Sequence, residues 1–93
     1  MKLLNLNESK SYTDEQKVKA IRSWRTSFYG IADSLAVVED FLTNPEAYEG
    51  DENKLQGVFN NIELVKDLAS TERQKAACAA ATDMLFDIAG HAF

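Results

Sequence analysis

Hydrophobic residues from position 21 to position 42 recur at steps of three and four. These residues are Ile21, Trp24, Phe28, Ile31, Leu35, Val38 and Leu42. Such steps place side chains on one face of an α-helix, whereas a strand would alternate with a period of two. Thr13 and Gln16 have the spacing of a capping box, and Pro45 disfavours helical backbone at the residue before it. The pattern therefore predicts one amphipathic helix over residues 13–43.

This helix is long for a chain of 93 residues. Its roughly 30 residues would span about 45 Å at about 1.5 Å per residue. A domain of this size has a radius of gyration of only about 12–13 Å. Two arrangements remain open: the helix bends, with Gly30 near its middle as the obvious position, or a second copy of the chain covers its ends. A homo-oligomer is accordingly part of the prediction.

Two further helices follow the first. Residues 51–68 carry apolar positions at helical spacing, and Asp51 can act as the N-cap. Residues 71–89 begin with a second capping box, in which Thr71 is followed three residues later by a glutamine. Gly90 is a natural C-terminal stop for this helix.

The chain is expected to form one domain, residues 1–93, with an all-α fold of three antiparallel helices and a long N-terminal helix that follows an arm at residues 1–12. No apolar run approaches the roughly 18 residues of a membrane span, and the N-terminus has no apolar stretch of signal-peptide length. The one cysteine, Cys78, cannot form an internal disulfide, which fits a reducing compartment. These features predict a cytoplasmic protein without a membrane partner.

Charge is unevenly distributed along the chain, whose formal net charge is −5. Residues 1–30 hold six basic and three acidic side chains, whereas residues 31–63 hold eight acidic side chains and one basic side chain. Duplex nucleic acid is not expected as a partner, because it requires a broad positive face. The acidic stretch from Asp33 to Glu63 suits a basic protein partner instead.

Catalytic and metal-binding patterns are absent from the sequence. The only histidine, His91, lies near the C-terminus, and no histidine is placed to activate Cys78. The four glycines are scattered, so they form no phosphate-binding loop. We therefore predict a protein that is not an enzyme and that has no catalytic residues, metal site or cofactor.

Basic and aromatic residues gather in the first part of the long helix and at the start of the last one. The candidate ligand-binding residues are Tyr12, Lys19, Arg22, Arg25, Tyr29 and Arg73. Arginine binds phosphate through paired N–H donors, and an aromatic ring can stack on a base. This combination suits a small nucleotide ligand. The alternative is a solvated basic face whose aliphatic stems flank the hydrophobic seam.

Two motifs resemble those of a known family. The first is Thr13-x-Glu15-Gln16, followed by Ala20-Ile21-Arg22 and then by Phe28-x-x-Ile31-Ala32-x-x-Leu35. It resembles the first helix of the anti-CBASS sponges, small helical-hairpin proteins with which phages sequester cyclic oligonucleotide signals. The second is the run from Thr71 to Ala77 together with Met84-Leu85-Phe86, which is similar to the second hairpin helix of that family.

The resemblance implies a non-enzymatic homo-oligomer in the cytoplasm of a phage host. Such a protein would bind cyclic di- or trinucleotides between protomers and withhold them from bacterial effectors. Tyr12 would stack on a base, and Arg73 would bind a phosphate. The alternative function is an acidic inhibitor or adaptor that binds a basic protein, such as a nucleic-acid-handling or defence enzyme.

Overall fold

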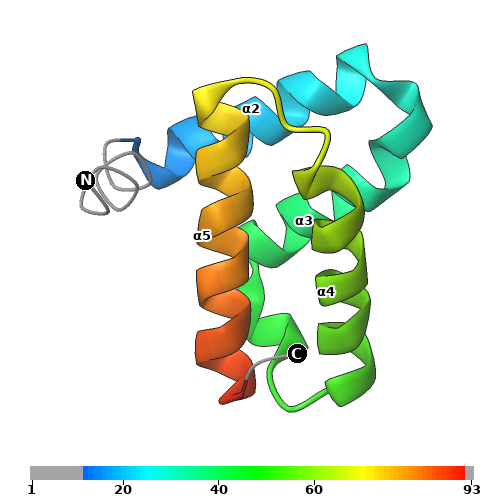
Figure 1. The fold of residues 1–93 in the computed structure, drawn as a ribbon. Coiled ribbons are helices and arrows are strands. Elements are labelled where there is room, and N and C mark those ends of the chain that lie inside the picture. Colours follow the sequence, from blue (N-terminus) through cyan, green and yellow to red (C-terminus); the bar gives the residue numbers. More distant parts are fainter. Residues whose placement is uncertain (1–11, 92–93) are drawn as a thin grey trace.

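The computed structural model describes residues 12–91, and these residues fold into four α-helices and two short 3-10 helices without a β-strand (Figure 1). The elements in chain order are α2 (Asp14–Ser27), η1 (Tyr29–Ile31), α3 (Ala32–Thr43), η2 (Pro45–Tyr48), α4 (Glu52–Lys66) and α5 (Glu72–Ala89). The all-α prediction is confirmed. The predicted number of helices is wrong, because four α-helices are present and not three.

The single helix predicted over residues 13–43 is two helices, α2 and α3, joined by η1. Just before the break, the hydroxyls of Thr26 and Ser27 donate to backbone carbonyls of the preceding turn, a contact compatible with the end of a helix. Phe28 then leaves helical geometry, with φ −142° and ψ 77°. Gly30 lies within η1, so of the two arrangements that the sequence left open the chain adopts the bend, and the bend interrupts the helix completely.

The break allows α3 to pack against α2, so that the two halves of one hydrophobic seam cover each other (Figure 1). Ile21 and Trp24 of α2 and Leu35 and Val38 of α3 are all buried. A straight helix of about 45 Å would exceed the largest dimension of the molecule, 33 Å. Helix length therefore gives no reason for a second chain, and the homo-oligomer stays a prediction.

All four helices contribute to the core, which is entirely apolar. Its members are Ile21, Trp24, Ile31, Leu35, Val38, Phe41, Leu55, Val58, Ile62, Val65, Ala77, Cys78, Ala81 and Leu85. Alanine on the inner face of α5 lets this helix pack closely between α2 and α4. Phe28 belongs to the predicted seam and yet is 44% exposed, because the backbone at the break turns it away from that face.

Helix ends follow the capping residues of the sequence. Thr13 and Thr71 each form a complete capping box with the glutamine three residues later. Asp51 accepts from the Lys54 amide at the start of α4, and Gly90 ends α5 in the left-handed conformation with φ 76°. The helices predicted over 51–68 and 71–89 are thus confirmed to within two residues. Residues 1–11 of the predicted arm lie outside the described residues.

Tyr48 fixes the connection between α3 and α4. Its hydroxyl donates to the Asp40 carboxylate, and its ring packs edge-on against Phe41 with centroids 5.3 Å apart. The Lys54 ammonium lies 5.9 Å from the centre of the same ring. These contacts hold η2 against the end of α3. Within residues 12–91, no helix is long and apolar enough to cross a membrane.

Candidate binding surfaces

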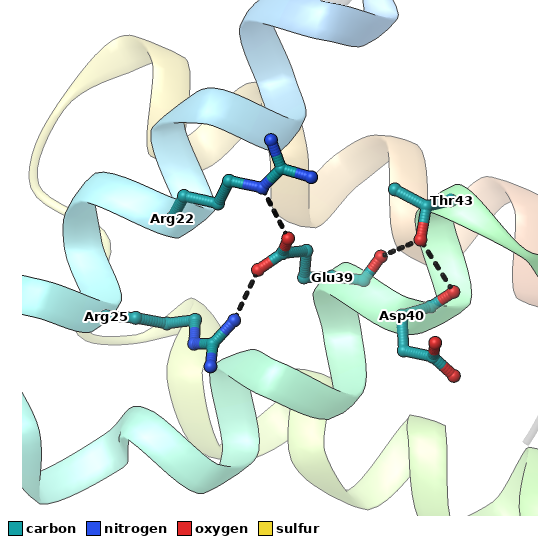
Figure 2. A network of polar contacts seen from close by, with 5 residues as sticks. All are labelled: Arg22, Arg25, Glu39, Asp40 and Thr43. Atoms are coloured by element: carbon teal, nitrogen blue, oxygen red, sulfur yellow. Dashed lines mark hydrogen bonds and ion pairs between the residues drawn. The ribbon is translucent and has the colours of Figure 1, made fainter.

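The basic residues of α2 face a carboxylate of α3 (Figure 2). Arg22 donates through Nε to Oε2 of Glu39, and Arg25 donates through Nη1 to Oε1 of the same carboxylate. Both donor–acceptor distances are 2.6 Å. The Glu39 side chain is only 12% exposed. Partial burial alone would raise the pKa of Glu39, but the hydrogen bonds and positive charges of the two arginines outweigh it and hold the pKa below its ordinary value. Figure 2 also shows the Thr43 hydroxyl closing the last turn of α3.

A shallow hollow of about 440 Å³ lies beside this ion pair. It is lined by Arg22, Arg25, Thr26, Tyr29, Ala32 and Glu39. Tyr29 is 81% exposed, so its ring is available at the rim. We call this site the arginine hollow.

A second hollow of about 380 Å³ runs between α2 and the start of α5. It is lined by Gln16, Lys19, Ala20, Ser23, Thr71, Arg73 and Gln74. The Arg73 guanidinium carbon lies 5.7 Å from the centre of the Tyr12 ring, within cation–π distance. We call this site the α2–α5 groove. Lys19 and Arg73 line it, and Tyr12 lies next to it against Arg73, while the other three candidate residues line the arginine hollow.

Most basic side chains of the described chain already have acidic partners. Apart from the two arginines on Glu39, the ion pairs are Lys17–Asp14, Lys19–Glu15, Lys66–Glu63 and Lys75–Glu72. Within residues 12–91, Lys54 and Arg73 alone have no carboxylate within ion-pair distance, and each of them lies against a tyrosine ring. The basic face predicted from the sequence is therefore largely neutralised within the chain.

Acidic side chains without basic partners are found at the end of the molecule where α3, η2, the start of α4 and the end of α5 converge (Figure 1). The acidic end comprises Asp40, Glu46, Glu49, Asp51, Glu52 and Asp87. A contact of 3.4 Å from His91 Nε2 to Glu52 joins the end of α5 to α4. The acidic stretch predicted from the sequence includes Glu46 but not Asp87, which lies in α5. Because α4 and α5 are antiparallel, the end of α5 lies near the start of α4, and this order could have indicated that Asp87 belongs to the acidic end.

Residues 12–91 hold no cluster of three or more His, Cys, Asp or Glu side chains that could bind a metal ion. Cys78 is buried in the core, and burial raises the pKa of its thiol to about 11 despite the opposing charge of Lys66. The thiol is therefore protonated at neutral pH and is a poor nucleophile.

Comparison of the chain with models of protein families, with curated proteins and with solved structures finds no match. The resemblance to the anti-CBASS sponges thus rests on the two sequence motifs alone.

Proposed function

We propose that this chain is a non-enzymatic binding protein whose acidic end engages a basic surface of a partner protein. The observation that carries the proposal is the difference in pairing between the two kinds of charge. Basic side chains of the described residues mostly have acidic partners, whereas at the acidic end Glu46, Glu49 and Asp87 have no ion-pair partner among the described residues. The acidic end therefore presents negative charge that the chain itself does not neutralise, which favours association with a positive patch.

The acidic end is also held in a defined shape. Asp40 is bonded to the Tyr48 hydroxyl, and Asp51 caps α4 through the Lys54 amide. Glu46 and Glu49 lie in and just after η2, and both are exposed. Carboxylates at fixed positions can occupy the sites where a nucleic-acid-binding protein contacts phosphates. An inhibitor of a nucleic-acid-handling or defence enzyme is therefore the kind of function we propose.

Co-purification from the cells that naturally express the chain tests this function. The test variant combines Glu46→Lys, Glu49→Lys and Asp87→Lys. The matched control combines Glu15→Lys, Glu63→Lys and Glu72→Lys, which changes the net charge equally but lies outside the acidic end. We expect one stoichiometric basic protein with the wild type and the control, released by high salt and lost with the test variant. Retention of the same protein by the test variant would refute the proposal.

A second candidate function has a specific observation in its favour, the stacking of Arg73 against Tyr12 in the α2–α5 groove. We propose here, as the alternative, a sponge that sequesters cyclic di- or trinucleotides. Tyr12 would stack on a base, and Lys19 and Arg73 would meet the phosphates. In this alternative the groove is completed by a second copy of the chain.

Calorimetric titration with cyclic dinucleotides and trinucleotides tests the sponge. Tyr12→Ala and Arg73→Ala should each abolish the heat of binding, whereas Lys75→Ala, which removes a charge from the same helix outside the groove, should not. Light scattering of the same samples reports whether a homo-oligomer forms. An absence of heat with every cyclic nucleotide would exclude this function and leave the acidic-end proposal intact.

A further inference from the structure

The arginine hollow contains more positive charge than the packing of α2 on α3 requires. Ile21, Trp24, Leu35 and Val38 already join these two helices through a buried apolar contact. Ion pairs at or near the surface contribute little to stability on average. Two arginines that converge on one carboxylate nevertheless leave a net charge of one positive unit beside a hollow.

The geometry around Glu39 is that of an occupied anion site. Each of its oxygens accepts one N–H, from Arg22 on one side and from Arg25 on the other (Figure 2). A phosphate group binds arginine pairs through separate oxygens in the same manner. A guanidinium has five N–H donors, and each arginine uses one of them here. The arginine side chains are 61% and 39% exposed, so an external anion can reach them.

Tyr29 adds a second recognition element to the same hollow. It follows the end of α2 at the break, and its ring is the most exposed large hydrophobic side chain of the described residues. An exposed ring next to two guanidinium groups suits a ligand in which a planar ring is attached to a phosphate. The hollow volume of about 440 Å³ lies within the size range of small-ligand sites.

We propose that Arg22, Arg25 and Tyr29 form a binding site for a phosphate monoester attached to an aromatic ring system, and that Glu39 occupies the phosphate position when no ligand is bound. The carboxylate carries one negative charge, whereas a phosphate monoester carries about 1.5–2 at neutral pH, so the ligand neutralises the arginine pair more completely. Glu39 acts as an internal competitor and lowers the apparent affinity by the fraction of time for which it holds the arginines. This site is independent of the acidic end and of the α2–α5 groove.

Titration of the full chain with adenosine 5′-monophosphate, adenosine and inorganic phosphate tests the site. Glu39→Gln keeps the shape of the side chain and removes its charge, so it should bind adenosine monophosphate at least about tenfold more tightly than the wild type. Tyr29→Ala should lose the preference for adenosine monophosphate over inorganic phosphate. Lys66→Ala, which removes a positive charge outside both hollows, should leave both results unchanged. No binding, or equal binding by the wild type and Glu39→Gln, would show that the arginine pair is only a structural clamp.

A second measurement covers the case in which Glu39→Gln does not fold. In the nuclear magnetic resonance spectrum of the wild type, the Nε–H signal of Arg22 reports its bond to Glu39 directly. Addition of adenosine monophosphate should move this signal and leave the corresponding signal of Arg73 in place. An unchanged Arg22 signal at saturating nucleotide would overturn the proposal.

Discussion

The basic face of α2 and the acidic end differ in what their charges contact. On α2, Arg22 and Arg25 share a carboxylate from the acidic half of the chain. At the acidic end, the carboxylates of Glu46, Glu49 and Asp87 have no ion-pair partner among the described residues. A block of charge in the sequence is therefore a poor guide to the charge available for binding, because the fold can neutralise one block and leave another exposed.

The largest expected effect is a difference in unfolding free energy between a substitution on the α2–α3 ion pair and one at the acidic end. Glu39→Ala removes the carboxylate that joins α2 to α3, and we expect it to lower the free energy of unfolding by about 1–2 kcal/mol because two charge-assisted hydrogen bonds are lost. Glu46→Ala should change this free energy by less than about 0.5 kcal/mol, since it breaks no contact. Urea denaturation of both variants makes the measurement. Equal effects would contradict the difference in pairing.

Helix ends could be predicted because capping is local. Thr13, Asp51, Thr71 and Gly90 carry their signals within four residues. A bend near Gly30 was one of two arrangements that the sequence allowed, but a complete break at Phe28 could not be predicted, because the apolar spacing continues through it without interruption. Tertiary packing favours the break, because reversal of the chain lets the apolar faces of α2 and α3 bury each other.

The same break explains why the candidate site was only partly predicted. In a straight helix Arg22 and Glu39, 17 residues apart, would be separated by about 25 Å. Only the reversal at η1 brings their side chains to 2.6 Å. Residue type and spacing pointed to Arg22, Arg25 and Tyr29, which are near one another in sequence, but not to the Glu39 carboxylate that accepts hydrogen bonds from both arginines.

A smaller and pH-dependent effect follows from the lowered pKa of Glu39. Because the folded-state pKa lies below the unfolded value, this pair stabilises the protein above the unfolded pKa and loses its contribution as pH falls through the folded pKa. The difference in unfolding free energy between the wild type and Glu39→Gln should therefore shrink from neutral pH to about pH 2. Chemical denaturation at a series of pH values measures it. A difference that stays constant with pH would show that the charge of Glu39 contributes nothing.

The smallest effect concerns the shape of the acidic end. Burial, the hydrogen bond to Asp40 and the charge of that carboxylate together raise the pKa of Tyr48 to about 12. Because the folded state keeps the proton more tightly, the contribution of Tyr48 is complete below its ordinary pKa of 10.0 and is lost as pH rises to about 12. Absorbance titration should show a late ionisation near pH 12 that is absent in Tyr48→Phe. Identical titration curves for the wild type and Tyr48→Phe above about pH 11 would indicate that η2 is not held against α3.

The difference in available charge between the acidic end and α2 can be measured most directly by paramagnetic relaxation enhancement of the backbone amide protons. One experiment uses a cationic nitroxide and the other an anionic nitroxide. The ratio of the two relaxation enhancements at each amide reports the local electrostatic potential. Residues 45–52 and 86–89 should be relaxed much more strongly by the cationic probe. Residues 19–25 of α2 should favour the anionic probe only weakly, because Lys19, Arg22 and Arg25 are paired with two carboxylates and only one positive unit remains. Strong enrichment of the anionic probe along residues 19–25 would contradict the account, since the basic face would then be the available one.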